Sequence, residues 1–332
     1  MNLFDRRNFL RYAGLGIFST LFTRKAEATT FLMKKFLALP PKETPFITPN
    51  EQFYVVNYAK PPQIDAADWA LEITGKVERP LRLTYEEILA RPSVEKMVTL
   101  ECIDNEVAGD LISNAVWKGI PLKELIDECR PKPGVIDVAM FGADAYSDGI
   151  TLDRALNFDV FLAYQMNGET LPKEHGYPLR AVVPGLYGIK NVKWLRKIDL
   201  VDEDFKGYWQ QKGWTDTATI KVTSRIEAPG PYNTVKTGYT FRGIAFGGGG
   251  YGVRSVELSF DGGKDWVAAT LDPTPSRYSW VFWKYEWKDP TPGSYQVVCR
   301  ATDKLGQSQT SFVARAFPDG TAGLHSIVTF VE

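Results

Sequence analysis

The second half of this chain alternates between apolar and polar residues in short runs, and this pattern constrains the fold more than any other feature. The runs are separated by glycine, proline and turn residues such as Asp261-Gly262-Gly263, and they cover 239–246, 256–260, 266–271, 279–287 and 295–300. Regularly spaced short strands of this kind are typical of an immunoglobulin-like sandwich. We therefore expect an all-β domain over residues 217–332.

Residues 51–216 have a different pattern, in which strands and helices alternate irregularly. Strands are expected over 69–73 and 135–141, with a short helix or turn over 154–159. Thr84 and Glu87 form a capping box that predicts a helix ending before Pro92. A chain of 332 residues is long enough for two cores. Because the regular rhythm of a doubly wound sheet is missing, we expect a mixed α+β first domain.

A further helix is predicted after Pro121, because apolar residues recur there at helical spacing. The residues at i, i+3, i+4 and i+7 are Leu122, Leu125, Ile126 and Cys129. Cys129 is therefore predicted to lie in the core. Cys299, on a predicted strand, is also expected to serve packing. Three cysteines are few, and an odd number of them cannot all pair, so a disulfide framework is not expected. Cys102 is then free to act as a metal ligand or nucleophile.

The N-terminus has the pattern of a twin-arginine export signal. Residues 5–11, with Arg6 and Arg7, precede an apolar run over 12–22, and Ala26-Glu27-Ala28 closes the segment. We expect residues 1–28 to direct export to the periplasm or beyond the membrane. An uncleaved anchor is the alternative, although the run is shorter than the ~20 residues that span a bilayer. The proline-bearing residues 29–50 are expected to form an extended arm.

Cys102 follows a short strand-like run at 98–100 and enters a loop of acid and amide side chains. A thiol at the end of a strand, on a loop, has the position of a metal ligand or nucleophile. The alternative is a buried, inert cysteine, since free cysteine is among the most buried residue types. The sequence around it leaves both open.

His175 and Arg180 lie close together in the chain, and Lys190 and Lys193 follow after a glycine-marked turn at 185–188. An imidazole with fixed cations would suit a phosphate-bearing anion. A structural histidine is the competing interpretation. The glycines at 247–250 lack the lysine and the strand-to-helix context of a phosphate loop. With 39 basic and 40 acidic residues and no long basic run, a nucleic-acid partner is not expected.

Several motifs together resemble the sulfite oxidase family of molybdopterin enzymes. They are TLECIDN at 99–105, WKGIPL at 117–122, the stretch LAYQMNGETLPKEHGYPLRAVVPGLYGIKNVKWL at 162–195, and the region 238–271. The resemblance implies a molybdopterin-binding domain followed by a dimerisation domain, with a possible homodimer through the latter. It also implies one Mo-molybdopterin per chain, whose molybdenum is held by the pterin dithiolene and the Cys102 thiolate.

By matched position, the resemblance assigns two further sets of residues. The active-site tyrosine of the family falls at or beside Trp214, which we take as catalytic together with Cys102. The residues expected to hold the pterin are Tyr54, Val55, Val56, Asn57, Tyr58, Asp144, His175, Arg180, Asn191, Val192 and Lys193.

The chain departs from the family where substrate-binding arginines are expected. Val56 and Tyr58 replace an arginine and a histidine, Glu106-Val107 replaces an Arg-Arg pair, and Tyr251 replaces a further arginine. A neutral, aromatic pocket should bind a dianion poorly. We therefore expect a small-molecule substrate other than free sulfite, converted by two-electron oxidation or oxygen-atom transfer.

Other functions remain open from the sequence. A periplasmic sulfite dehydrogenase could use other cations, such as Arg242 or Arg254. The periplasmic methionine sulfoxide reductases share the pterin core but lack the second domain. A cofactor-free exported binding module would need Cys102 to be merely buried. The chain has no Cys-x-x-Cys-His haem motif. Both the enzyme expected above and a sulfite dehydrogenase would therefore need a separate redox partner, such as a c-type cytochrome or membrane subunit.

Overall fold

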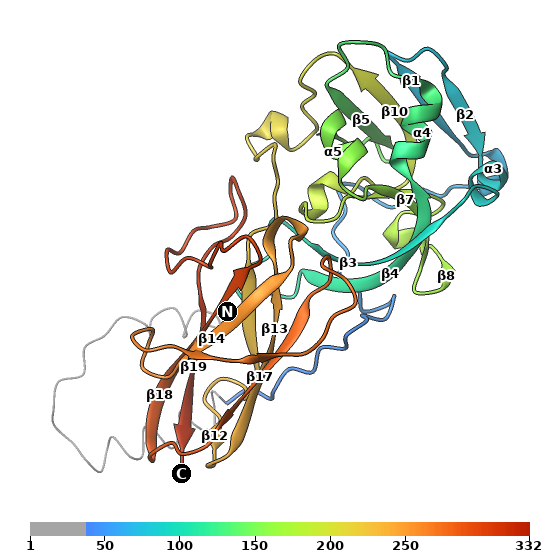
Figure 1. Ribbon diagram of the computed structural model, residues 1–332. Coiled ribbons are helices and arrows are strands. Elements are labelled where there is room, and N and C mark those ends of the chain that lie inside the picture. Colours follow the sequence, from blue (N-terminus) through green and yellow to red (C-terminus); the bar gives the residue numbers. More distant parts are fainter. Residues whose placement is uncertain (1–37) are drawn as a thin grey trace, which may run out of the picture.

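The computed structural model describes residues 38–332, which form two parts that each contain two β-sheets (Figure 1). The predicted export signal at 1–28 and the first residues of the predicted arm lie outside the described residues. Strand dominates residues 38–332, where the α-helices are short and lie in the first part, and the second part contains the 3-10 turn η5 (Gly248–Gly250). No helix within residues 38–332 is long and apolar enough to cross a membrane.

One sheet of the first part mixes parallel and antiparallel pairing. Its strand order is β2-β1-β10-β5-β6, and only β1 and β10 are parallel. Its strands are β1 (Ala70–Gly75), β2 (Leu81–Thr84), β5 (Asp137–Gly142), β6 (Ser147–Thr151) and β10 (Leu195–Val201). The helices beside it are α3 (Tyr85–Leu89), α4 (Leu122–Cys129) and α5 (Leu152–Asn157). Their apolar faces share one buried core with the sheet.

The other sheet of the first part carries Cys102. Its order is β3-β4-β7-β8, with β9 paired to β7. Its strands are β3 (Val94–Glu101), β4 (Ile112–Pro121), β7 (Phe161–Met166), β8 (Glu169–Thr170) and β9 (Arg180–Val182). Cys102 is the first residue after β3. The chain then loops back into β4, which pairs with β3 along its whole length.

The second part is a sandwich of two sheets around a single core. One sheet has the order β11-β13-β17-β16 and the other β12-β19-β18-β14-β15. The strands are β11 (Thr223–Ala228), β12 (Thr234–Val235), β13 (Tyr239–Phe246), β14 (Val253–Ser259), β15 (Val267–Ala268), β16 (Thr270–Leu271), β17 (Val281–Trp287), β18 (Gly293–Asp303) and β19 (His325–Val331). Residues from both sheets, among them Phe241, Trp283 and Val297, are buried between them. The immunoglobulin-like assignment of this sandwich stays a prediction.

The two parts are joined along β3. Thr99 donates its backbone N–H to the carbonyl of Tyr278 (2.8 Å), and its hydroxyl oxygen accepts from the N–H of Trp280 (2.9 Å). A separate buried cluster crosses the junction and includes Ile103 and Ile112 from the first part. The strand that leads to Cys102 is therefore held by the second part as well as by its own sheet.

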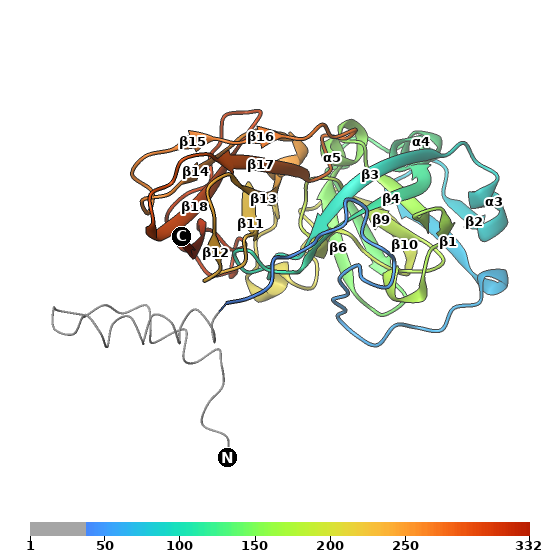
Figure 2. The ribbon, with the colours of Figure 1, turned by 90° about the horizontal axis from the view of Figure 1, so that it is seen from below.

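The described part of the predicted arm runs in extended form across both halves (Figure 2). Lys42 donates its N–H to the carbonyl of Glu227 (2.8 Å), and Thr48 donates to that of Asn114 on β4 (2.8 Å). The carbonyl of Asn50 then lies 3.0 Å from Nε2 of His175 in the first part. The arm thus links the sandwich to the first part.

Several local predictions are confirmed. Thr84 and Glu87 form the capping box of α3, and the four apolar residues predicted for α4 are its buried residues. Cys129 and Cys299 are fully buried in the two main cores. The prediction missed β4, which is buried on both faces and so shows no alternation. It also merged β15 and β16, two short strands, into one run.

His325 generates a prediction about acid stability. Its Nδ1 accepts the N–H of Ile226 (2.9 Å), so this nitrogen must be unprotonated. Burial, followed by the charges of Arg225 and Lys42, lowers the pKa of His325 to about 4. In the unfolded chain a histidine titrates near 6.5. The unfolded state therefore binds the proton first, and the stabilisation present above pH ~6.5 is lost as the pH falls towards 4.

We expect His325→Asn, whose side-chain oxygen can still accept from Ile226, to reduce this acid sensitivity. The drop in the free energy of unfolding between pH 7 and pH 4.5, measured by urea denaturation, should shrink by on the order of 2 kcal/mol. His175 stays in both proteins and keeps part of the slope, because its pKa is also lowered to about 4. An unchanged slope would show that His325 does not control it.

Candidate functional site

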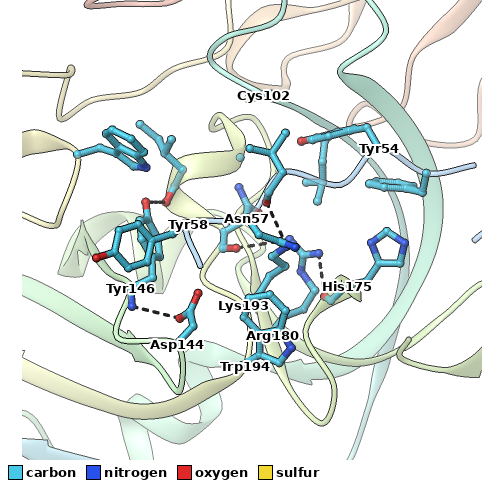
Figure 3. A pocket seen from close by; sticks show the side chains of 17 residues that line it. Tyr54, Asn57, Tyr58, Cys102, Asp144, Tyr146, His175, Arg180, Lys193 and Trp194 are labelled. Carbon is cyan, nitrogen blue, oxygen red and sulfur yellow. Dashed lines mark hydrogen bonds between the residues drawn. The ribbon is translucent and has the colours of Figure 1, made fainter. Parts of the chain in front are cut away.

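The largest group of predicted site residues meets in one cavity of about 110 Å³ beside the end of β3 (Figure 3). It is lined by Phe53, Tyr54, Val56, Asn57, Tyr58, Leu100, Cys102, Asp144, Tyr146, His175, Arg180, Gly188, Ile189, Asn191, Lys193, Trp194 and Trp209. Segments far apart in the sequence contribute to it, because residues 53–58, the end of β3, the turn after β5, the start of β9 and the loop before β10 converge there.

Cys102 lies in the cavity wall at the start of a loop that is braced by its own side chains. Its N–H donates to the carbonyl of Leu111 (2.9 Å), which closes the loop. Asn105 braces the interior, donating to Glu101 Oε1 (2.8 Å) and accepting from the Leu111 N–H (2.9 Å). Only 8% of Cys102 is exposed, and burial raises the pKa of its thiol to about 11. The thiol lines the cavity and faces little solvent.

Arg180, at the start of β9, is a buried cation held by neutral groups. Its guanidinium donates to the carbonyls of His175 (3.0 Å) and Asn191 (3.4 Å) and lies over the ring of Trp117. Within residues 38–332 it forms no ion pair with a carboxylate, and burial lowers its pKa to about 10. Its charge is therefore available to a bound anion.

Lys193 places a second cation beside the first. Its ammonium group donates to the carbonyls of Val56 (3.2 Å) and Glu174 (3.1 Å) and to the side-chain oxygen of Asn57. Burial, followed by the nearby Arg180, lowers the pKa of Lys193 to about 7. Within residues 38–332 the buried Arg180 and the partly buried Lys193 both lack a carboxylate partner. An anion stabilises such a pair most, since each cation disfavours the charge of the other.

His175, on the 3-10 turn η2 (Lys173–His175), completes this end of the cavity. Its Nε2 lies 3.0 Å from the carbonyl of Asn50, which fixes this nitrogen as the donor in the neutral ring. Burial lowers the pKa of His175 to about 4, and the charges of Arg180 and Lys193 act in the same direction. The imidazole is therefore neutral at pH 7, and its other nitrogen is left to accept a hydrogen bond.

The opposite side of the cavity is aromatic. Figure 3 shows Tyr58 and Tyr146 on one side and His175 on the other, with Arg180 and Lys193 between them. Tyr58 packs on Tyr208 (ring centroids 4.4 Å apart), which in turn contacts Trp209 (5.0 Å). The Tyr146 hydroxyl donates to the carbonyl of Ile189 (2.7 Å) and is thereby fixed. One side of the cavity thus suits an anion and the other an uncharged group.

Not every residue predicted to hold the pterin lines the cavity. Val55 is exposed and Val192 is in the core of the first part, so the two flank lining residues without lining the cavity themselves. Asp144 does line it, from the turn between β5 and β6, and accepts the Tyr146 N–H (3.1 Å). The side chain of Asn191 hydrogen-bonds to backbone groups of Val183, Leu186 and Tyr187, so it is not free to bind a cofactor.

Trp214 is not among the lining residues, whereas Trp209 is. Trp214 stands behind Trp209, with ring centroids 6.3 Å apart, and contacts Phe317 of the second part on its other side (5.3 Å). Its catalytic role stays a prediction. Trp209, which counting along a matched motif did not single out, is separated from Trp214 by the 3-10 turn η4 (Gln210–Lys212).

Lys190 has a role that the sequence pattern missed. It was predicted as a cation of the anion pocket, but it is 2% exposed and its ammonium group pairs with Asp148 (2.8 Å) and Asp216 (2.9 Å). A third donor bond goes to the carbonyl of Gly149 (2.9 Å). Lys190 is therefore a structural cation of η3 (Gly188–Lys190) and contributes no free charge to the cavity.

The residues present fit a phosphate-bearing pterin with a metal. The cavity brings a thiol, two unpaired cations and a hydrogen-bonding imidazole together, as such a group requires. Glycine at position 188 lets the backbone lie close to Tyr54 and Cys102. A Cβ there would lie 3.1 Å from the Tyr54 hydroxyl and 3.8 Å from the Cα of Cys102. Gly188 is a lining residue that only its place in the glycine-marked turn could have indicated.

Comparisons with known proteins agree with this fit. The chain matches the oxidoreductase molybdopterin binding domain over residues 58–209 and the Mo-co oxidoreductase dimerisation domain over 215–317. It is 32% identical to sulfite oxidase of Gallus gallus, covering 85% of this chain and 72% of that protein. The sulfane dehydrogenase SoxCD from Paracoccus pantotrophus has a similar structure, with a TM-score of 0.75, 25% identity and coverage of 88% of this chain and 84% of that one.

Plant nitrate reductases are also similar. Nitrate reductase [NADH] 1 of Oryza sativa subsp. japonica is 32% identical over 80% of this chain, which corresponds to 36% of that protein. The chain thus spans about a third of the length of the nitrate reductases it matches.

Lys190 and Lys193 allow a matched test of the two kinds of cation. We expect Lys190→Met to lower the free energy of unfolding by about 3–5 kcal/mol, because Asp148 would be left buried without its counter-charge. Lys193→Met should change it by less than about 1 kcal/mol, since the lost hydrogen bonds are offset by removing a buried charge. Urea denaturation of the cofactor-free protein measures both values.

Pterin content should show the opposite order: Lys193→Met, which has the smaller effect on stability, should have the larger effect on the pterin content of the purified protein. Lys193→Met should retain markedly less pterin than the wild type although it folds normally, because a cation facing the bound anion is gone. If Lys193→Met folded normally and retained pterin fully, Lys193 would not be a cofactor-binding residue.

Proposed function

The chain belongs to the sulfite oxidase family of molybdopterin oxidoreductases, and from this premise we propose an exported enzyme that acts on a substrate other than free sulfite. The reaction is a two-electron oxidation or oxygen-atom transfer. The chain is an oxidoreductase that uses a molybdenum-molybdopterin cofactor, as its sulfite oxidase and nitrate reductase relatives show. A cofactor-free binding module is therefore no longer an alternative.

In this proposal, different residues of the cavity bind different parts of the cofactor. Cys102 supplies the protein's sulfur ligand, while Arg180 and Lys193 neutralise the phosphate of the pterin. His175 accepts a hydrogen bond from the cofactor through the nitrogen that Asn50 leaves free. When bound, the metal centre supplies an acceptor for an electron pair, which leaves in single-electron steps. The aromatic side chains exclude water from the cavity.

The choice of substrate rests on one observation, the position of Val56. It lines the cavity where sulfite-oxidising members of the family are expected to have an arginine. The lining cations are Arg180 and Lys193, and the proposal assigns both to the cofactor. A dianion would then meet Val56, Tyr58 and Tyr146 without a counter-charge, and these side chains offer it no cation in exchange for its lost hydration.

The other departures from the family lie outside this cavity. Glu106 and Val107 line a separate cavity on the other side of the Cys102 loop, and Tyr251 lines neither cavity. Arg242 and Arg254, the cations invoked for a sulfite dehydrogenase, are not lining residues. The position of these residues outside the cavity supports the proposal over the runner-up function, a periplasmic sulfite dehydrogenase that reduces a c-type cytochrome.

Two properties of the assembly belong to the same proposal. The dimerisation-domain match over 215–317 supports a homodimer formed through the sandwich. Electrons leave to a separate redox partner, a c-type cytochrome or a membrane subunit, because the chain has no haem-binding motif of its own. The name of the similar SoxCD structure, a sulfane dehydrogenase, favours reduced sulfur compounds other than sulfite as the first substrates to test.

Cys102 and Cys129 provide a matched pair for testing this function. Cys102→Ala should lose nearly all molybdenum while retaining the fold, because the protein's metal ligand is removed. Cys129→Ala, a substitution in the core, should keep about one molybdenum per chain. Metal analysis of both variants against the wild type gives the comparison, and equal molybdenum in Cys102→Ala and the wild type would contradict the assigned ligand.

Sulfite turnover with ferricyanide as electron acceptor, measured on the same molybdenum-loaded wild type, tests the substrate. We expect turnover at least a hundredfold below that of a sulfite oxidase with an intact arginine pocket. Val56→Arg should raise sulfite turnover by restoring a cation to the cavity wall. Brisk wild-type turnover would make the sulfite dehydrogenase hypothesis correct.

Export can be tested at the twin-arginine motif. Replacing Arg6 and Arg7 with lysine should leave the protein in the cytoplasm, whereas the wild type should be recovered outside it. Cell fractionation followed by immunoblotting measures the distribution. A double variant that is exported as well as the wild type would show that another signal is used.

A further inference from the structure

A second cavity, of about 160 Å³, lies behind Cys102 at the junction of the two parts. Glu101, the last residue of β3, lines this cavity, whereas Cys102, the next residue, lines the first. The lining residues are Glu101, Asn105, Glu106, Val107, Tyr187, Lys221, Val222, Thr223, Gln307, Ser308, Gln309, Thr310, Thr321, Ala322 and Gly323. The function proposed above does not use this cavity.

Glu101 is an incompletely bonded carboxylate in the floor of the cavity. It is 5% exposed, and its Oε1 accepts a hydrogen bond from Asn105 Nδ2 (2.8 Å). Its Oε2 is buried and has no hydrogen-bond partner among residues 38–332. A buried carboxylate oxygen without a donor is costly, so the open space beside it is suited to a ligand that donates.

The charges around the cavity favour a cation. Glu106 stands at the exposed rim and adds a second carboxylate. Lys221 adds one positive charge to the lining, and its ammonium group is held at the carbonyl of Gly320 (2.6 Å), so the two lining carboxyl groups outnumber the single lining cation. Arg225, just beyond the lining, is paired with Glu227 (2.8 Å). The remaining polar lining consists of amides and hydroxyls, which are neutral.

The geometry distinguishes between kinds of cation. A guanidinium binds a carboxylate best through both oxygens at once, but Asn105 already occupies Oε1 of Glu101. A divalent metal ion requires several oxygen ligands, whereas here one buried carboxylate oxygen is free. An ammonium group is a compact donor that needs a single strong acceptor and can share its other protons with hydroxyls.

We propose that this cavity binds the primary ammonium group of a small organic molecule, with the Glu101 carboxylate as its anchor. The volume of about 160 Å³ suits a molecule of about the size of benzene, which a ~150 Å³ engineered protein cavity accommodates. Gln307, Ser308 and Thr310 at the rim are exposed, so the ligand enters from solvent. Val107 offers an apolar contact to its carbon chain.

The test is calorimetric titration of the molybdenum-loaded, full-length protein with n-butylammonium chloride at constant ionic strength. We expect saturable binding at one site per chain, and at least tenfold weaker binding of the neutral isostere 1-butanol. Glu101→Gln should weaken n-butylammonium binding at least tenfold. Glu203→Gln, at an exposed carboxylate outside the cavity, should bind like the wild type.

A second variant keeps the test decisive if Glu101→Gln fails to fold. Glu106→Lys changes only the exposed rim and places a competing ammonium group at the entrance, so it should also weaken binding at least tenfold. Glu203→Lys is its matched control. The proposal is overturned if the wild type shows no saturable binding, if 1-butanol binds as tightly, or if the folded Glu101 and Glu106 variants retain wild-type affinity.

Discussion

The positive charge of Arg180, buried without a carboxylate, is the constraint on which the functional cavity depends. Carbonyls of His175 and Asn191 hold the guanidinium, so the turn before β9 and the loop before β10 must both fold around it. Lys193 adds a second, partly buried cation beside it. Such an arrangement is poorly compensated in the protein alone, and an anionic cofactor supplies what is missing. The site is therefore built to be completed by its ligand.

The two lysines of one short segment show how position decides the role of a charge. Lys190 is neutralised by Asp148 and Asp216 and holds η3 against β6. Lys193, three residues later, meets carbonyls and an amide and keeps its charge for a ligand. The rigid pair supports the wall that the free cation lines. Neither role can be recognised from a lysine in a sequence, because the aspartates that pair with Lys190 and the groups that hold Lys193 are distant in the chain.

Local patterns made the helices and much of the sandwich predictable. The capping box at Thr84 and the apolar spacing in α4 are short-range signals, and both elements form as expected. The cavity itself came mainly from matched motifs, which gave Cys102, His175, Arg180 and Lys193 correctly as neighbours. Long-range packing could not be predicted from the sequence. The strand β4 shows no alternation because both faces are buried, and Trp209 takes the lining position that counting gave to Trp214.

The hydrogen bonds between Thr99 and the backbone of Tyr278 and Trp280 couple the unfolding of the two parts. The sandwich cannot swing away from the first part without breaking contacts of β3, three residues before Cys102. The buried cluster at the junction would be opened by the same movement. We therefore expect the two parts to unfold as one cooperative unit in spite of their separate cores, so that loss of the sandwich would also release the metal.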